Sequence, residues 1–294
     1  MESEKIDNVS ECPLVTVYMP THNRVELLQR AVESVLNQDY KNVELIVVDD
    51  KSTDSTLEYL VGIAQKDSRV KYIRNKENSG ACVSRNKAIF AAKGEFITGL
   101  DDDDYFLSNH ILGFIRAWNC KDTDCIALYS NTYIKEQHTT NKVRTKSKFY
   151  KKRDLICGKW IGNQIFTKTD YLKEIGGFEE DLLVWQDFEC WYRLLDFYNL
   201  KSSSIGQYSY VVDKSHPHER IGTKRADSIY SSYEIFCNKH KLNYNEKIIL
   251  GLQLGFNNGK IRKFNGVIRK LVYLPRFYNF KHSLYTLFKL LSNS

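Results

Sequence analysis

The stretch Gly94-Glu95-Phe96-Ile97-Thr98-Gly99-Leu100-Asp101-Asp102-Asp103-Asp104-Tyr105-Phe106 decides the architecture of this chain. Its apolar run, residues 96–98, predicts a short buried strand, and four consecutive aspartates follow it. Crowded carboxylates repel one another, which raises their pKa values unless a cation or hydrogen-bond donors hold them. Oxygen ligands at the end of a strand suit a hard divalent ion, Mg²⁺ or Mn²⁺. A metal site is therefore one hypothesis, and an acidic turn exposed to solvent is the other.

Strand and helix patterns alternate in the residues before this stretch. Apolar, β-branched runs at 14–19, 43–48 and 70–73 predict strands, and Pro20 is expected to end the first of them. Segments with helical periodicity or helix caps cover 27–36, 55–65 and 81–92. This order predicts an α/β fold, in which a mostly parallel, Rossmann-like sheet carries helices on both faces.

Polar residues follow three of the predicted strands, at 21–24, 49–50 and 101–104. In a parallel sheet these positions meet at one edge, where the ligands of such folds bind. The first strand is followed neither by Gly-x-Gly-x-x-Gly nor by a phosphate-binding Gly-x4-Gly-Lys loop, which disfavours a dinucleotide site and a P-loop. We therefore expect a nucleotide crevice of another kind at this edge.

The composition indicates a globular protein of the reducing cytosol. A chain of 294 residues with 42% hydrophobic residues can build one large or two modest domains. Its 7 cysteines are scattered and form no Cys-x-x-Cys pair, which argues against disulfides and zinc. The first residues are too polar for a signal peptide, and no apolar run reaches the ~20 residues of a membrane-spanning helix.

The net charge of +7 belongs to the C-terminal end. From Lys247 onward the chain has nine Lys or Arg residues and no acid, so the residues before it carry a net charge of −2. Aromatic residues interleave with these cations, a pattern typical of segments that bind nucleic acid or an anionic membrane surface. A second basic segment, residues 142–153, is expected to form a mobile loop that is either solvated or phosphate-binding.

The residues after the aspartates predict further elements. Ser108 is expected to cap a helix through residues 111–115, and strands are expected at 126–133 and 158–166. Another helix is expected to open at residues 185–187, and the chain from residue 223 onward is expected to be a helical extension.

Five spaced motifs resemble the successive signatures of family 2 glycosyltransferases of the GT-A fold. They are VYMPTHNR at 17–24, SVLNQ at 34–38, VVDDKSTD at 47–54, RN at 85–86 and LDDDD at 100–104. The similarity extends from residue 14 to about residue 220, and the subgroup that the chain resembles builds O-antigen or capsule repeat units in bacteria. The resemblance implies that a sugar is transferred from a nucleotide diphosphate donor with inversion, with the help of Mn²⁺ or Mg²⁺.

The resemblance also implies a role for each polar residue of the crevice. Asp103 would hold the metal ion, and Asp187 would be the general base that accepts the proton of the acceptor hydroxyl. The residues implied to bind the nucleotide sugar are Thr21, Asn23, Asp50, Arg85, Asp101, Asp102 and Arg220. Those implied to line the sugar and the acceptor are Gly162, Asn163, Trp185 and Gln186. Either histidine of His216-Pro217-His218 could complete the metal shell, and His218 is the residue that we assign.

The chain departs from the family pattern at one catalytic position. The family usually has Glu-Asp where this sequence has Gln186-Asp187, so one carboxylate is lost and the implied base is kept. Glu189 is a rival base, but two residues further along a helix it faces elsewhere.

We therefore predict a metal-dependent glycosyltransferase with three parts. Residues 1–106 form the nucleotide-sugar half, 107–222 the acceptor-binding and catalytic half, and 223–294 a basic, aromatic-rich helical region. The resemblance implies UDP-glucose or UDP-galactose as the donor. It implies a GlcNAc- or GalNAc-diphosphate-undecaprenol intermediate, or another saccharide, as the acceptor.

A lipid-linked acceptor implies a partner for the basic tail. We expect the tail to bind the anionic inner face of the cell membrane rather than nucleic acid, and simple packing against the catalytic domain is the alternative. Two rival functions also remain open from the sequence. One is a sugar-nucleotide nucleotidyltransferase that uses the same crevice, and the other is a non-catalytic membrane-surface module with a degenerate site.

Overall fold

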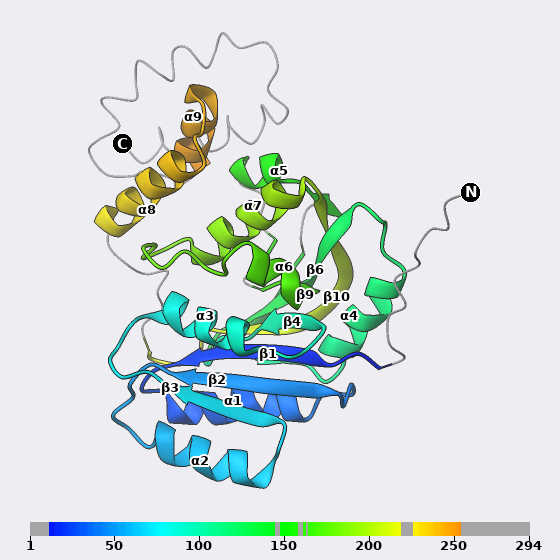
Figure 1. The fold of residues 1–294 in the computed structure, drawn as a ribbon, viewed down its shortest axis with the longest axis vertical. Coiled ribbons are helices and arrows are strands. Elements are labelled where there is room, and N and C mark those ends of the chain that lie inside the picture. The colour runs from blue at the N-terminus through cyan, green and yellow to red at the C-terminus, as the bar shows by residue number, and fades with distance from the viewer. Residues whose placement is uncertain (1–11, 145–147, 158–160, 163, 219–225, 254–294) are drawn as a thin grey trace.

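A computed structural model describes residues 12–144, 148–157, 161–162, 164–218 and 226–253. Its strands form one 10-stranded sheet in the order β3-β2-β1-β4-β9-β6-β10-β5, with β7 paired to β6 and β8 paired to β10 (Figure 1). The strands are β1 (Val15–Thr21), β2 (Val43–Asp49), β3 (Val70–Arg74), β4 (Phe96–Gly99), β5 (Tyr105–Phe106), β6 (Cys125–Lys135), β7 (Thr140–Val143), β8 (Phe149–Tyr150), β9 (Phe166–Lys168) and β10 (Lys201–Asp213).

The helices that cover this sheet come from along the whole described chain. They are α1 (Val25–Leu36), α2 (Thr56–Lys66), α3 (Ala81–Ala91), α4 (His110–Asn119), α5 (Lys152–Ile156), α6 (Thr169–Glu174), α7 (Gln186–Tyr198), α8 (Ala226–Lys239) and α9 (Tyr244–Gln253). Figure 1 shows α1 and α2 on one side of the sheet and α3 and α7 on the other.

The main strands of the sheet share one direction. β3, β2, β1 and β4 pair in parallel, and so do β6 and β10. The short β9 is antiparallel to both β4 and β6, so the two parallel groups point the same way. The expected α/β architecture, a mostly parallel sheet with helices on both faces, is confirmed.

Pro20 does not end the first strand, contrary to the sequence expectation. β1 continues to Thr21, and Pro20 is in register with Val48 of β2. Tyr18 accepts a main-chain hydrogen bond from Leu100, so Tyr18 and, two residues on, Pro20 direct their main-chain groups toward the β4 side. The pairing with β4 ends at Gly99, which lies opposite Tyr18, so Pro20 has no paired residue on that side. The lack of an N–H at Pro20 therefore costs the sheet no hydrogen bond.

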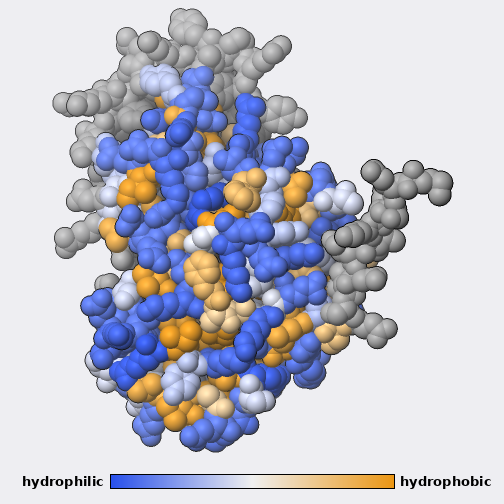
Figure 2. All heavy atoms as spheres, viewed as in Figure 1, coloured by the Kyte–Doolittle hydropathy of each residue, from blue (hydrophilic) through white to orange (hydrophobic). Residues whose placement is uncertain are grey.

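Two separate hydrophobic cores hold the sheet between its helices. Val15, Val17 and Met19 of β1 face one core, which is completed chiefly by α1, α2 and α4. Tyr18 faces the other core, with residues of α3, α6 and α7. This alternation is the two-residue period of a strand that is buried on both faces. On the surface drawn in Figure 2, hydrophilic side chains predominate between smaller apolar patches.

The second half of the sheet differs from expectation at three places. The basic segment 142–153 is not simply a loop, because its described residues include parts of β7, β8 and α5. Of the strand expected at 158–166, the described residues 161–162 and 164–165 are not in the sheet, and Phe166 begins β9. The cap of α4 is Asn109 rather than Ser108.

Helices α8 and α9 follow the sheet, as expected for a C-terminal extension. The buried carboxylate of Glu189 in α7 accepts a hydrogen bond from His240 at 3.0 Å and from Arg193 Nη2 at 2.8 Å. These contacts join α7 to the end of α8 and confirm that Glu189 faces away from Asp187. No helix within the described residues is long and apolar enough to cross a membrane. The tail from residue 254 onward lies outside the described residues.

Candidate active site

The polar residues that were predicted to meet do so at the carboxyl ends of β1, β2 and β4. Thr21 Oγ1 donates to Asp102 Oδ2 at 2.8 Å, and the main-chain N–H of Asp50 donates to Thr21 O at 2.9 Å. These bonds tie the ends of three neighbouring parallel strands together. The edge of the sheet therefore forms one polar site, as the positions of these residues in the sequence indicated.

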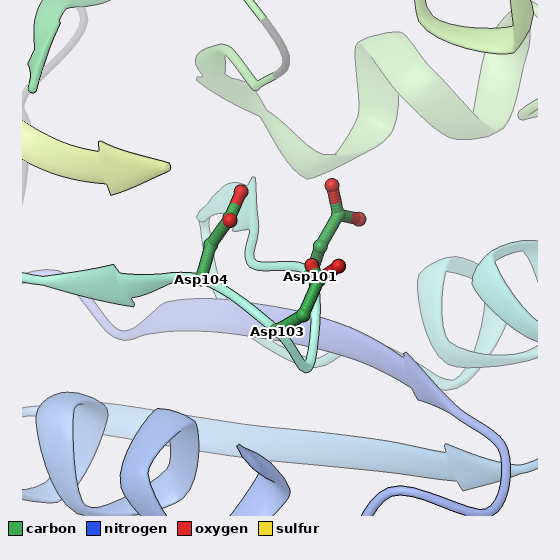
Figure 3. Close-up of side chains that lie close together, drawn as sticks. All are labelled: Asp101, Asp103 and Asp104. Atoms are coloured by element: carbon green, nitrogen blue, oxygen red, sulfur yellow. The ribbon is translucent and has the colours of Figure 1, made fainter. Parts of the chain in front are cut away.

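Three of the four aspartates bring their carboxylates together. Asp101, Asp103 and Asp104 each offer one oxygen, and these oxygens lie within 4.8 Å of one another. Figure 3 shows the three side chains rising from the turn that follows β4. Three close carboxylates form the donor set that Mg²⁺ or Mn²⁺ prefers, so the residues present fit the expected metal ion.

Asp104 is the most constrained member of the three. It is fully buried, its Oδ2 accepts from Tyr210 OH at 2.9 Å, and its Oδ1 accepts from the main-chain N–H of Asp213 at 3.1 Å. Both oxygens are thus used to attach β10 to the aspartate turn. Asp104 therefore has a structural role in addition to its place in the carboxylate cluster, and Asp103 is the principal candidate ligand.

Two arginines and a histidine lie around Asp103. Arg24 Nη1 is 3.4 Å from Asp103 Oδ2, and His216 Nε2 is 3.5 Å from the same oxygen. Arg30 Nη2 donates to the main-chain oxygen of Asp103 at 2.7 Å, while its Nη1 contacts Asp213 at 2.5 Å. The turn is therefore held from α1 and from the end of β10 at once.

Asp102 faces the β1 loop rather than the other three carboxylates. Arg24 Nη1 donates to its Oδ1 at 3.1 Å, in addition to the bond from Thr21. Burial raises the pKa of Asp102 to about 6, with the Arg24 charge opposing this shift and the Asp103 charge adding to it. Burial is thus the main cause of the raised pKa of Asp102, and repulsion by a neighbouring carboxylate is a smaller one.

Asp50 and Asn23 lie where a nucleotide was expected but are engaged with the protein. The carboxylate of Asp50 accepts from Asn75 Nδ2 at 2.7 Å, Ser79 N at 2.8 Å and Gly80 N at 2.7 Å. Asn23 has a positive φ of 52°, and its main-chain N–H donates to Ser52 Oγ at 2.9 Å. Both residues thus brace the loops after β1, β2 and β3.

Arg85 joins the aspartate turn to the start of α7. Its Nη2 donates to Asp101 Oδ1 at 2.9 Å, and its Nη1 donates to Gln186 Oε1 at 2.7 Å. Gln186 in turn donates from Nε2 to Leu182 O at 2.9 Å. Two residues assigned to different ligands from the sequence, Arg85 and Gln186, are therefore bonded to each other.

Asp187 has the properties of a general base. Its Oδ1 is buried and has no hydrogen-bond partner among the described residues. Burial raises the pKa of Asp187 to about 7; the charge of Arg85 opposes that rise, and the charge of Asp101 adds to it. A carboxylate with a pKa near neutrality and an unused oxygen can accept a proton at physiological pH.

The remaining assigned residues are distributed around α7 and the end of β10. Trp185 precedes α7 with a positive φ of 66° and packs edge-on against Phe188 and Tyr233. Gly162 also has a positive φ, 113°. His218 is exposed, and it is His216 that lies beside Asp103. Asn163 and Arg220 lie outside the described residues.

Sequence reasoning missed several residues that shape the site. Gln164 donates to Asp101 Oδ1 at 3.4 Å and accepts from Tyr18 OH at 2.7 Å. Arg24 belongs to the first family motif, and Gln164 follows the residues implied to line the sugar. Their polar side chains in these segments could therefore have identified them as site residues. Arg30 gave no such signal, because it lies in the middle of an ordinary amphipathic helix.

Comparisons with known proteins agree with this geometry. The profile of glycosyl transferase family 2 matches residues 16–175. The chain is 34% identical, over 235 residues, to the Escherichia coli (strain K12) protein WcaA, whose name assigns it provisionally as a colanic acid biosynthesis glycosyl transferase; the match covers 78% of this chain and 82% of that protein.

Two further similarities concern an enzyme and a solved structure. The first is an Escherichia coli enzyme named UDP-Glc:alpha-D-GlcNAc-diphosphoundecaprenol beta-1,3-glucosyltransferase WfaP, which is 39% identical over 123 residues, 42% of this chain and 47% of that enzyme. The second is the crystal structure of S. aureus TarS 1–349 in complex with UDP-GlcNAc, which has a TM-score of 0.68 at 19% identity and covers 95% of this chain and 80% of that one. At this low sequence identity, the similarity to TarS shows a shared fold and nothing more.

Proposed function

The chain belongs to glycosyl transferase family 2, and on that premise we propose that it transfers a hexose from UDP-glucose or UDP-galactose to a lipid-linked sugar. Membership in this family makes it a glycosyltransferase, which decides against the nucleotidyltransferase and the non-catalytic module. The proposed acceptor is a GlcNAc- or GalNAc-diphosphate-undecaprenol intermediate of O-antigen or a related surface polysaccharide. The anomeric configuration is proposed to invert.

The observation that carries this proposal is the state of Asp187. Its buried Oδ1 lacks a partner among the described residues, and its pKa is raised to about 7. In the proposed step the acceptor oxygen bonds to the anomeric carbon of the donor. The bond from that carbon to the diphosphate oxygen breaks, and its electron pair leaves with the nucleoside diphosphate. Asp187 accepts the proton of the acceptor hydroxyl, as a general base worth about 10²–10⁴-fold.

The aspartate turn is proposed to bind the donor. Asp103 would hold a divalent ion, with His216 on the same side of its carboxylate and Asp101 directed toward the ribose. Such an ion, when bound, neutralises the negative charge of a leaving diphosphate. Thr21 and Asp102 would stay bonded to each other beneath the nucleotide, and Asp50 would keep the loops around the base in place.

The donor and acceptor are supported by a relative rather than by the site. The relative named for UDP-Glc and GlcNAc-diphosphoundecaprenol shares 39% of its residues with this chain over 123 positions. A lipid-linked acceptor lies at a membrane, so we propose that the protein works at the inner face of the cell membrane as a peripheral protein. The basic residues from Lys247 onward suit an anionic lipid surface.

A donor scan tests the proposed function. The protein is incubated with UDP-glucose, UDP-galactose and other sugar nucleotides, together with a GlcNAc-diphosphate-lipid analogue. Transfer should require Mn²⁺ or Mg²⁺, stop with EDTA and be abolished by Asp103→Ala, and NMR of the product should show an inverted anomeric carbon. Full transfer in the presence of the chelator would contradict the metal site, and retained configuration would contradict the role of Asp187.

A further inference from the structure

Arg85 spans two parts of the site although it belongs to the interior of α3. Its side chain is only 6% exposed, and its guanidinium reaches Asp101 at the end of β4 and Gln186 at the start of α7. The two contacts are 2.9 and 2.7 Å long. One planar cation thus connects the carboxylate turn to the helix that carries Asp187.

The segment that leads into α7 is fixed by the same helix. The guanidinium carbon of Arg85 lies 5.2 Å from the centre of the Phe178 ring, a cation–π distance. Asn86, the next residue of α3, bonds the main chain of Phe178 at both ends: it donates to Phe178 O at 2.9 Å and accepts from Phe178 N at 2.6 Å. Adjacent residues of α3 therefore hold both the approach to α7 and its first residue.

The other end of this connection is equally well held. Asp101 Oδ1 accepts from Arg85 and, at 3.4 Å, from Gln164 Nε2, while Gln164 accepts from Tyr18 OH at 2.7 Å. Gly99 leaves room for this contact, because a Cβ there would collide with Gln164 Oε1 and the Tyr18 ring. Asp101 is thus anchored to β1 as well as to α3.

Gln186 has a protein partner at each end of its amide. The oxygen accepts from Arg85 and the nitrogen donates to Leu182 O. The amide is therefore held by α3 and by the segment before α7. Its neighbour Asp187 is the next residue of the same helical turn, so any movement of Gln186 moves the base.

We propose that Arg85 is a positioning residue that fixes Asp187 at a set distance from Asp101, and that Gln186 is the acceptor through which it does so. The idea rests on the proposed function, because it requires Asp187 to be the base. A base that moves by about 1 Å can lose on the order of 10²-fold in rate. Without the Gln186 acceptor, Arg85 would keep its ion pair with Asp101, but its buried Nη1 would lose the hydrogen bond to α7, and an unsatisfied buried donor favours a shift of the helix.

The competing view is that Arg85 binds the donor directly. Arg85 Nε is buried and has no hydrogen-bond partner among the described residues, so it could donate to a nucleotide. The two views differ in what a change at Gln186 does. If Arg85 is a positioning residue, Gln186→Leu should reproduce the effect of changing Arg85; if Arg85 binds the donor, it should not.

Four variants of the full chain test the proposal: Gln186→Leu, Gln186→Glu, Arg85→Lys and the double variant Arg85→Lys/Gln186→Leu. Gln186→Glu keeps an acceptor oxygen for Arg85 at nearly the same size, so a comparison with Gln186→Leu isolates the loss of that oxygen. The measurements are kcat and KM with the best sugar nucleotide, the Kd of UDP with Mn²⁺ by calorimetry, and the Tm of each variant.

Gln186→Leu should lower kcat about 10-fold or more, and by more than Gln186→Glu does, with the Kd of UDP nearly unchanged. The double variant should be hardly worse than Arg85→Lys, because contacting residues are not additive. An unchanged kcat for Gln186→Leu, or a loss of UDP affinity with Arg85→Lys alone, would overturn the proposal.

The proposal can fail separately from the proposed function. If the unchanged chain transfers no sugar from any nucleotide, the proposed function fails while the connection itself is still measured by the Tm values. Two single changes that together lower Tm by no more than the larger one alone support a shared contact. Fully additive losses of Tm would overturn it whatever the activity.

Discussion

Lowering the pH should switch off transfer through the protonation of Asp187. Burial raises the pKa of this carboxyl to about 7, against the opposing charge of Arg85. Only the ionised form can accept the proton of the acceptor hydroxyl, so kcat should rise with pH and level off above neutrality. At a pKa of about 7 the ionised fraction is about nine-tenths at pH 8, about a tenth at pH 6 and about a hundredth at pH 5.

The expected loss of kcat is therefore about 10-fold between pH 8 and pH 6, and about 100-fold between pH 8 and pH 5. The assay is the initial rate of sugar transfer with saturating donor, acceptor and Mn²⁺, in buffers of constant ionic strength. Asp187→Asn keeps the shape of the side chain and removes the base, so its residual kcat should be ~10²–10⁴-fold lower and flat over the same range.

Glu189→Gln is the control for this experiment. It removes a carboxylate from the same helix, but Glu189 is bonded to Arg193 and His240 and faces away from Asp187. The variant should lose about 1.5–3 kcal/mol of stability, as expected for hydrogen bonds to a charged group. Its kcat should still decrease at low pH, as in the unchanged chain. The assignment of the base would be refuted if kcat of Asp187→Asn still decreased at low pH, or if kcat of the unchanged chain stayed level down to pH 5.

Two other predictions concern the aspartate turn and the tail. Tyr210→Phe removes the hydrogen-bond donor to the fully buried Asp104 and should lower the free energy of unfolding, measured with urea, by about 1–3 kcal/mol. In a Mn²⁺ titration it should affect metal affinity less than Asp103→Ala does. Equal effects of the two changes on metal binding would contradict a structural role for Asp104. Truncation before Gly259 should abolish salt-sensitive co-sedimentation with anionic liposomes, because each basic residue near the surface contributes about 1 kcal/mol to membrane binding. Equal binding by the full-length and truncated chains would contradict a membrane role for the tail.

The alternation of short apolar runs and amphipathic segments was enough to predict the fold. β1 and β2 are buried along their whole lengths, so most of their residues are apolar, and this pattern is visible in the sequence. The same order of elements brought Thr21, Asp50 and Asp101 to one edge without any further information, because the carboxyl ends of parallel strands meet there. The family motifs identified the chemistry.

The pairing of side chains across the site was decided only by the tertiary structure. Arg85 and Gln186 are separated by 101 residues, and their hydrogen bond depends on how α3 and α7 pack, which no local pattern encodes. The four adjacent aspartates look equivalent in the sequence, yet Asp102 bonds Thr21 and Asp104 bonds Tyr210, since each side chain leaves the turn in a different direction. Local sequence therefore determined which residues reach the edge of the sheet, whereas long-range packing determined the partner of each one.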